Sequence, residues 1–335
     1  MTWKMPPEWH PHERTWMAFP TSGYTLGESP TDEQTARQTW ANVANAVSEF
    51  EKVSMVINPG DENQAKKLLS SEIELFELPL NDAWMRDIGP TFVLNDQGEL
   101  GAVDWIFNGW GAQSWASWDK DSKIACEISK LSLATHLPSE LVNEGGGIHV
   151  SSNGVVLLTE TVQQGAGRNP HLSKAEIEKE IHEKLGTHQA IWIKRGLTRD
   201  YDEFGTRGHI DIVACFAPNN TVLYHDQRNP NHPDYLVSQE VREVFMRAGF
   251  ETMAIEAPEV LSDHEGFVDY SYINHYTVNN GVILCSFNDA KDKEAKAKIR
   301  EAYPGREVVL VDATELFARG GGIHCITQQQ PRASR

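Results

Sequence analysis

The sequence predicts an α/β protein, because segments with helical periodicity alternate with short apolar segments typical of strands along the whole chain. Neither a Ser-, Gly- or Pro-rich linker nor a block of like charge divides the 335 residues, which favours one domain over residues 1–335. The peptide GGGIH occurs twice, at 145–149 and 320–324, and only the second copy is followed by a cysteine, Cys325. The duplication indicates an internally repeated scaffold in which one repeat carries a nucleophile.

The first helix is predicted over residues 31–50, where Trp40, Val43, Ala44 and Val47 recur at helical spacing without an intervening Gly or Pro. Thr31 is the expected N-cap. A strand at 53–58 follows directly. Further helices are expected near 62–70 and at 174–184, 237–248 and 290–302, and strands near 91–94, 154–159, 189–194, 210–216, 277–285 and 307–311.

The chain is acidic, with 48 Asp and Glu against 30 Lys and Arg and a formal charge of -18. Binding of nucleic acid needs clustered cations, so we expect no nucleic-acid partner. Such a field attracts a small cationic substrate instead. With 40% hydrophobic residues and 10 Trp, the chain can bury a substantial core.

Cofactor and membrane signals are absent from the sequence. The cysteines, Cys126, Cys215, Cys285 and Cys325, form no CxxC pair, so neither a zinc site nor a disulfide framework is indicated. No GxGxxG or GK[ST] motif opens a helix after a strand. Without a signal-like apolar start or a run of membrane-spanning length, we expect a soluble cytoplasmic protein with no membrane partner, metal or cofactor.

Three constellations could carry chemistry. Cys325 stands beside a triple glycine, although a lone cysteine is more often a small buried hydrophobe. A nucleophilic thiolate needs a partner acid or base. The segment RGHID supplies His209 and Asp211, which would share one face of the strand predicted at 210–216.

The third constellation is NDAWMRDIGP at 81–90, where Trp84 and Asp87 flank an arginine, an arrangement that could equally be an ion pair closing a loop. Glu144 precedes the first GGGIH directly. Together with Asp211 these carboxylates suit a planar guanidinium, which accepts oxygen partners on several edges. An indole can cover its face. The chemistry that follows is nucleophilic attack on an amidinium carbon.

These motifs resemble the agmatine deiminase family, which includes Porphyromonas-type peptidylarginine deiminases and belongs to the pentein (guanidino-group-modifying) superfamily. The resemblance covers nearly the whole chain, through MPPEWHPHERTWMAFP, NDAWMRDIGPTFV, NEGGGIHV, GTRGHIDIVACF and GGGIHCITQQQP. It implies a pentein α/β propeller, in which five pseudo-symmetric ββαβ modules surround a central active site.

The resemblance also implies the reaction and the roles. The enzyme would hydrolyse agmatine to N-carbamoylputrescine and ammonia through a covalent thiouronium on Cys325, without a metal or organic cofactor. His209 would be the general acid and base, and Asp87 and Asp211 would grip the guanidinium. Glu144 and Trp84 match further substrate-contacting positions. As partners we expect the cationic guanidino substrate and a second copy of the chain, in a homodimer.

The chain departs from the family pattern in the segment that would contact the end of the substrate opposite the guanidinium. The family typically has TNGHxDN, whereas this chain has EFGTRGHIDI, which places Arg207 where Asn is usual. An arginine at the rim favours a substrate with a carboxylate. It repels the ammonium of agmatine unless Asp202 or Glu203 compensates, and it could instead pair with one of those acids. Agmatine is the first candidate, and arginine or another guanidino acid the second.

Three other functions remain open from the sequence. An amidinotransferase would deliver the same thiouronium to an amine instead of water. A non-catalytic guanidino-binding protein would need the carboxylates alone, so the presence of both Cys325 and His209 weighs against it. Metal-dependent amidine hydrolysis is the third alternative, because the chain has 13 histidines, which are common metal ligands. None of them forms HExxH or a comparable ligand cluster.

Overall fold

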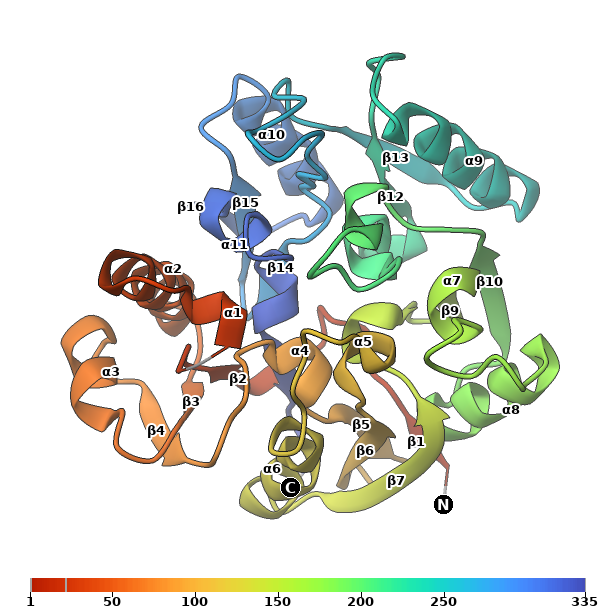
Figure 1. Cartoon of the computed structure of the whole chain (residues 1–335). Helices are drawn as coiled ribbons and strands as arrows, with labels where there is room; N and C mark the ends of the chain where they lie inside the picture. The colour runs from red at the N-terminus through yellow and green to blue at the C-terminus, as the bar shows by residue number, and fades with distance from the viewer. Residues whose placement is uncertain (1, 22, 335) are drawn as a thin grey trace.

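The computed structural model describes residues 2–21 and 23–334, and its strands form five separate sheets around a common centre (Figure 1). In sheet order, the first two are β1 (Trp3–Lys4), β5 (Thr91–Asn95), β6 (Leu100–Ile106) and β7 (Thr135–Val142), and β10 (Gln189–Ile193), β9 (Val155–Thr159) and β8 (His149–Val150). The next two are β11 (Ala214–Phe216), β12 (Val222–Asp226) and β13 (Thr252–Glu256), and β14 (Tyr276–Val278), β15 (Gly281–Ser286) and β16 (Glu307–Asp312). The last is β17 (Gln328–Pro331), β2 (His12–Ala18), β3 (Val53–Ile57) and β4 (Glu74–Glu77).

Each sheet repeats one pattern, in which an antiparallel pair of strands is followed by a parallel pair. A helix makes each parallel crossover, as βαβ connections require. These helices are α6 (Ile124–Leu131), α8 (Lys174–Leu185), α9 (Asp234–Arg247), α10 (Asp292–Ala302) and α2 (Pro30–Ser48). The predicted ββαβ modules of the pentein fold are therefore confirmed.

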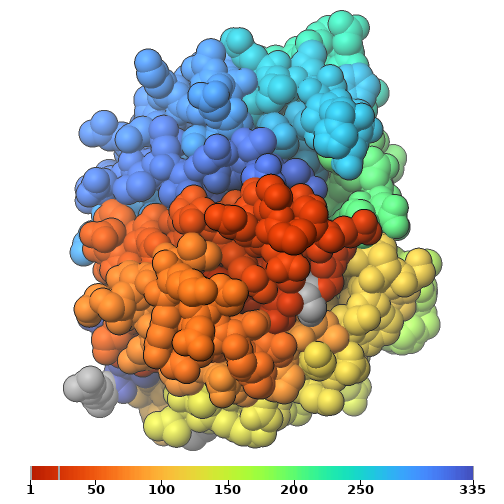
Figure 2. Space-filling view, turned by 60° about the vertical axis from the view of Figure 1, so that its left-hand side comes forward, coloured from red at the N-terminus to blue at the C-terminus, as the bar shows by residue number. Residues whose placement is uncertain are grey.

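The fifth sheet joins the two ends of the described chain. Strand β17 pairs antiparallel with β2, with Gln328 opposite Trp16 and Gln330 opposite Arg14. Figure 2 shows the N-terminal segments, in red, lying directly against the C-terminal ones, in blue. The N-terminal segment is consequently held at the centre of the molecule. No described helix is both long enough and apolar enough to cross a membrane.

The first predicted helix begins earlier than expected. Ser29, not Thr31, is the N-cap: its hydroxyl accepts from the Asp32 amide, and the Asp32 carboxylate accepts from the Ser29 amide. Pro30 occupies the first helical position, where its missing N–H costs nothing. This capping box fixes the start of the helix, so the Thr31 prediction was wrong.

The predicted strand at 210–216 is mostly wrong. Residues Ile210–Ile212 form a turn of 3-10 helix, and only Ala214–Phe216 pair as a strand. The apolar run IDIVACF suggested a strand, but hydrogen bonds from the backbone amides of Thr206, Gly208 and His209 to Asp200 bend the chain. His209 and Asp211 therefore do not share a strand face.

The predicted strand at 277–285 is interrupted by a hairpin turn. Strands β14 and β15 pair antiparallel, and the turn between them places Asn280 at φ +62, which asparagine tolerates. The other predicted helices and strands are confirmed to within a few residues. The remaining helical segments are α1 (Gly23–Leu26), α3 (Glu62–Leu68), α4 (Met85–Ile88), α5 (Gly109–Ala112), α7 (Glu160–Gln163), α11 (Thr314–Phe317), and the 3-10 turns η1 (Asp121–Lys123), η2 (Gly145–Gly147), η3 (Arg199–Tyr201), η4 (Ile210–Ile212), η5 (Pro218–Asn220) and η6 (His324–Ile326).

Candidate active site

Short turns precede the first strands of the sheets, and they meet at the centre of the molecule. Helix α4 lies before β5, η2 before β8, η4 before β11 and η6 before β17, and α4 packs against both η2 and η6. Because the module is repeated around the centre, one such turn from each module lies there. The buried residues with reactive or polar side chains on or beside these turns, including the one before β14, include Asp87, Glu144, His209, Asp211, Asn274 and Cys325.

Cys325 is 5% exposed and lies among polar groups. Its Sγ accepts from Asn274 Nδ2 at 3.3 Å and lies 3.5 Å from Asp211 Oδ2. Burial raises the pKa of the Cys325 thiol well above its ordinary value, and the nearby carboxylates act in the same direction. The cysteine is therefore a neutral thiol until a positive charge arrives beside it.

His209 lies between two carboxylates. Its Nε2 is 3.3 Å from Glu144 Oε2, and its Nδ1 is 3.9 Å from Asp87 Oδ1. Burial lowers the pKa of His209, but the two carboxylates outweigh it and raise the pKa to about 9. The imidazole is consequently protonated at neutral pH and can act as a general acid.

Glu144 is fully buried and bound by protein groups on both sides. Arg168 Nε donates to its two oxygens at 3.0 and 2.9 Å, while His209 approaches Oε2. Burial raises the pKa of Glu144, but Arg168 and His209 together outweigh it and hold the pKa below the ordinary value. In this structure Glu144 is thus the carboxylate that orients His209. No sequence motif marks Arg168.

The two predicted guanidinium-binding carboxylates differ in their surroundings. Asp87 accepts from the Gly146 amide at 3.0 Å and from Trp110 Nε1 at 2.8 Å, and burial raises its pKa. Asp211 Oδ2 is 2.8 Å from His324 Nδ1, while Oδ1 is buried without a hydrogen-bond partner among the described residues. Burial raises the pKa of Asp211, but His324 outweighs it and lowers the pKa.

The middle glycine of each GGGIH copy touches catalytic side chains. A Cβ on Gly146 would collide with His209 Nδ1 and lie 3.0 Å from Asp87 Oδ1. A Cβ on Gly321 would lie 2.7 Å from the Trp84 ring and 3.1 Å from Cys325 Sγ. In both copies the middle glycine lets the backbone pass close to catalytic side chains, where a larger residue would not fit. This requirement explains why GGGIH occurs in two different modules.

Replacing Gly146 with alanine should lower turnover by about 100-fold, because the added methyl displaces His209 from its position. Steady-state kinetics on the folded variant measures this effect. Gly147→Ala is the matched control, since the nearest atoms to a Cβ there belong to Val162, Asn143 and Gln163, at 3.1, 3.2 and 3.5 Å, and to no catalytic residue. Equal losses in the two variants would contradict a specific role for the space beside Gly146.

Aromatic residues cover the site. Trp84 is buried, its Nε1 donates to Thr25 Oγ1 at 3.1 Å, and its ring lies beside the turn of Cys325. Farther out, Tyr24 and Phe204 stack with ring centroids 4.3 Å apart, and Trp115 meets the Tyr24 ring edge-on at 4.7 Å. A cation in the site would be enclosed by indole and phenol rings.

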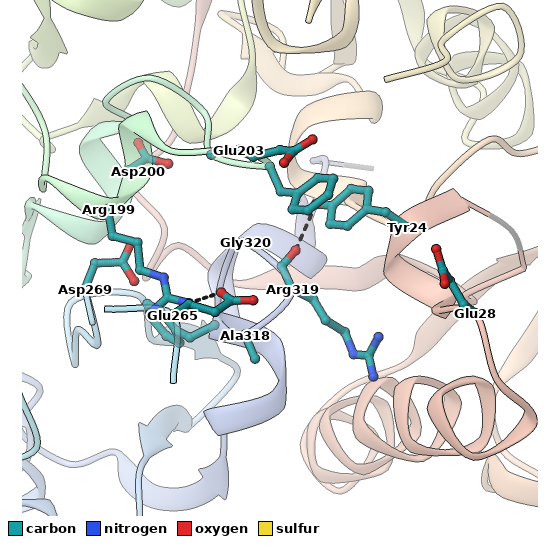
Figure 3. Close-up of a pocket in the computed structure, with 13 residues that line it drawn as sticks. Tyr24, Glu28, Arg199, Asp200, Glu203, Glu265, Asp269, Ala318, Arg319 and Gly320 are labelled. Carbon is teal, nitrogen blue, oxygen red and sulfur yellow. Dashed lines mark hydrogen bonds and ion pairs between the residues drawn. The ribbon is translucent and has the colours of Figure 1, made fainter. Parts of the chain in front are cut away.

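A cavity of about 270 Å³ lies over the turn before Cys325 (Figure 3). Its lining includes the acidic residues Glu28 and Glu203 and the stacked rings of Tyr24 and Phe204. Gly320 forms part of its floor, and the next residue is Gly321 beside the cysteine. The catalytic side chains do not line this cavity, which adjoins them only through Gly320 and Gly321.

Arg207 is not aimed at a ligand carboxylate. Its Nη1 donates to the Tyr201 carbonyl and its Nη2 to Gln113 Oε1, the latter at 2.8 Å. Asp202 and Glu203 are both exposed, and neither pairs with Arg207, so the predicted pairing was wrong. Asp202 faces solvent, whereas Glu203 lines the cavity.

Two residues that shape the site escaped the sequence analysis. The buried Asp200 carboxylate accepts from the amides of Thr206, Gly208 and His209 at 2.6, 2.6 and 3.1 Å, which bends the chain into the turn that carries His209. Asn274 bonds Cys325 and also accepts from the His324 amide at 3.0 Å. Each stands alone in the sequence, and no motif spacing indicates it.

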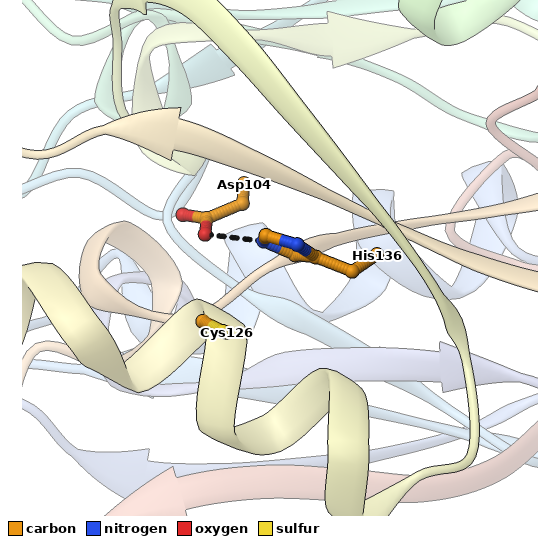
Figure 4. A group of neighbouring side chains, drawn as sticks. All are labelled: Asp104, Cys126 and His136. Carbon is orange, nitrogen blue, oxygen red and sulfur yellow. Dashed lines mark hydrogen bonds and ion pairs between the residues drawn. The ribbon is translucent and has the colours of Figure 1, made fainter.

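One group of three potential metal ligands exists within residues 2–21 and 23–334, at Asp104, Cys126 and His136 (Figure 4). His136 Nε2 lies 2.7 Å from Asp104 Oδ2. The Lys130 ammonium lies beside Cys126, where a metal ion would meet its charge. The group lies on β6, α6 and β7, and none of its members belongs to the central cluster.

Comparison with known proteins agrees with this geometry. The family model described as Porphyromonas-type peptidyl-arginine deiminase matches residues 4–331. A Streptomyces coelicolor protein provisionally named an agmatine deiminase is 54% identical over 99% of this chain and 100% of its own length. An agmatine deiminase of Pseudomonas aeruginosa is 35% identical over 98% and 95%.

A solved structure described as the agmatine deiminase of Enterococcus faecalis catalysing its reaction superposes with a TM-score of 0.90 at 31% identity, covering 98% of this chain and 96% of that one. Both the sequence and the arrangement of modules thus match over nearly the full length. The chain belongs to the Porphyromonas-type peptidyl-arginine deiminase family, whose agmatine deiminases it resembles throughout.

Proposed function

We propose that this protein hydrolyses agmatine to N-carbamoylputrescine and ammonia. The observation that carries the proposal is the convergence of a thiol, an imidazolium and two carboxylates in one buried cluster. Carboxylates recognise a guanidinium through paired hydrogen bonds, and Asp211 Oδ1 is buried with no partner of its own among the described residues. The similarity to agmatine deiminases supports the same substrate class.

The first half of the reaction begins when the cationic guanidinium settles beside Cys325. Its charge favours the thiolate, and the thiol proton is released to solvent as the cation enters. Sulfur then bonds to the guanidinium carbon. His209 donates its Nδ1 proton to the departing nitrogen, since Nε2 is held by Glu144. The C–N bond breaks, ammonia leaves, and a thiouronium remains on sulfur.

The second half uses the same residues in the opposite sense. Neutral His209 takes a proton from water, and the hydroxide adds to the thiouronium carbon. The tetrahedral adduct collapses by breaking the C–S bond, which yields the ureido product. The hydroxyl proton of the adduct passes to the leaving sulfur, which restores the thiol, and His209 keeps the proton that it took from water. Atoms and charges balance without a metal or cofactor.

Agmatine is favoured over arginine by the charges around the approach. Glu28 and Glu203 line the cavity over the turn before Cys325, and the whole chain is acidic. The arginines near this approach are already engaged. Arg199 lines the cavity but pairs with Asp263 and Glu265. Arg319 also lines it, donates to the Thr25 carbonyl and pairs with Glu315, while Arg207 donates to Tyr201 and Gln113. The ammonium end of agmatine therefore meets complementary charge, while the carboxylate of arginine does not.

The test is to incubate the protein separately with agmatine, arginine and guanidinobutyrate and to measure ammonia and ureido product. We expect the highest kcat/KM with agmatine, without an added amine acceptor, and activity that survives EDTA but is lost to iodoacetamide. Ammonia release only with an amine acceptor would establish amidino transfer instead. Faster turnover of arginine would overturn the choice of substrate.

Glu203→Gln should raise the KM for agmatine by about two- to fivefold, a modest effect because an exposed charge is screened. The value of kcat should change little, since Glu203 lies away from the reacting carbon. Asp202→Asn is the matched control, because Asp202 is equally exposed but does not line the cavity. Equal KM values for both variants and the wild type would exclude Glu203 from substrate recognition.

We also propose that the protein acts in the cytoplasm as a homodimer. The absence of a described membrane-crossing helix and the family of the chain are compatible with this proposal. Light scattering during gel filtration measures the oligomeric state.

A further inference from the structure

The histidines of the two GGGIH motifs, His149 and His324, both lie beside the carboxylate of Glu8, near the N-terminus. Glu8 lies in the segment between β1 and β2, and its side chain is 5% exposed. His324 Nε2 is 2.8 Å from Glu8 Oε1, and His149 Nε2 is 3.7 Å from Glu8 Oε2. The histidines of both copies of the motif therefore lie next to Glu8. Only His324 also contacts a residue of the catalytic cluster, Asp211.

His324 is held between two carboxylates. Its Nδ1 lies 2.8 Å from Asp211 Oδ2, and its Nε2 the same distance from Glu8. An ionised carboxylate can only accept hydrogen bonds, so both ring nitrogens must donate. A histidine that donates from both nitrogens is an imidazolium, and it carries a positive charge between Glu8 and Asp211.

His149 has the opposite arrangement. Its Nδ1 accepts a hydrogen bond from the Phe216 amide at 3.2 Å, so that nitrogen carries no proton. Its Nε2 stands farther from Glu8 than that of His324 does. His149 is therefore a neutral tautomer with no contact to Asp211.

We propose that Glu8, acting through the His324 imidazolium, keeps Asp211 ionised and fixes its orientation, and is thereby a positioning residue for the guanidinium site. The line runs from Glu8 to His324, to Asp211 Oδ2 and on to Cys325 Sγ at 3.5 Å. Because Oδ2 is committed to this line, Oδ1 is left to face the substrate. This inference rests on the proposed deimination at Cys325.

The charged surroundings agree with this assignment. Burial and Arg86 lower the pKa of His324, but Glu8 and Asp211 outweigh them and raise it. Burial raises the pKa of Glu8, yet the neighbouring cations hold it well below its ordinary value. The other titratable or charged groups facing this line are Arg86, Asp87, His149, His209, Cys215, His275, Tyr276, Cys285 and Tyr303.

The sign of the expected pH effect follows from the partners. With Glu8 present, His324 stays protonated through neutral pH. Removing that carboxylate lowers the pKa of His324, so the ring loses its proton as pH rises through the ordinary range. Asp211 then loses its cationic partner at the higher pH, and the grip on the guanidinium weakens.

The experiment uses Glu8→Gln, which keeps the size of the side chain and removes its charge. In protein with ¹³C-labelled histidine rings, His324 of the wild type should keep the imidazolium chemical shift through neutral pH. In the variant the pKa of His324 should fall, so that the ring loses its proton at a lower pH than in the wild type. The KM for agmatine at neutral pH should rise about tenfold, the loss expected for one charge-assisted hydrogen bond. A new alkaline limb should appear in kcat/KM.

His149→Gln is the matched control, because it removes the other histidine that faces Glu8 and should leave the titration of His324 and the pH profile unchanged. If Glu8→Gln lowers kcat/KM by the same factor at every pH, Glu8 has only a structural role and the proposal is overturned. A neutral His324 in the wild type would overturn it without any variant. The ring titration needs no turnover, so a wild type inactive on agmatine would refute the proposed function separately.

Discussion

Replacing Cys325 with serine should reduce ammonia release from agmatine by about 10⁴-fold or more, the scale of loss when a covalent nucleophile is removed. A serine hydroxyl in this buried site lacks both the nucleophilicity of sulfur and a base to activate it. Binding should persist, because the carboxylates that face the guanidinium are untouched. Single-turnover product analysis together with calorimetric titration of agmatine separates the two effects.

Cys126→Ser provides the control for the loss of a thiol. Cys126 lies on α6, is partly exposed, and belongs to none of the central turns. That variant should retain wild-type kcat and should still be inactivated by iodoacetamide, whereas Cys325→Ser should no longer react at the active site. Substantial turnover by Cys325→Ser would contradict a covalent intermediate on sulfur.

The residues that the sequence identified share one structural position. Asp87, Glu144, His209 and Cys325 each lie on a turn immediately before the first strand of a different sheet. Such turns carry recognisable glycine-rich motifs, because the backbone must pass closely there. Local sequence signals were therefore sufficient to find them, and the family resemblance supplied the module that brings them together.

The supporting residues could not be found in this way. Glu8 meets His324 across 316 positions, and Arg168 meets Glu144 across 24 with no motif between them. Buried polar side chains need partners, but the partner is chosen by the tertiary fold and not by spacing. The same reason explains the wrong strand at 210–216, since a run of apolar residues carries no information about the Asp200 carboxylate.

The turn that Asp200 organises leads to the second large effect. Asp200→Asn should lower the free energy of unfolding by about 2–4 kcal/mol, because an amide nitrogen would face backbone donors that now bind a charged acceptor. Asp200 Oδ2 alone accepts from Thr206 Oγ1 at 2.6 Å, Gly208 N at 2.6 Å and His209 N at 3.1 Å. Losing these bonds moves the backbone of the general acid itself, so kcat should also fall by about 100-fold.

Asp234→Asn separates the stability effect from the catalytic one. Asp234 is a similarly buried carboxylate whose Oδ1 accepts from the amide and hydroxyl of Thr198 at 2.7 and 2.6 Å, but it does not touch the His209 backbone. Urea unfolding should show a loss of stability in both variants, whereas kcat measured well below the unfolding transition should fall only in Asp200→Asn. Because the carboxylate acts on the backbone and not on the substrate, KM should change less than kcat. Equal kcat values in the two variants would mean that His209 reaches its position without Asp200.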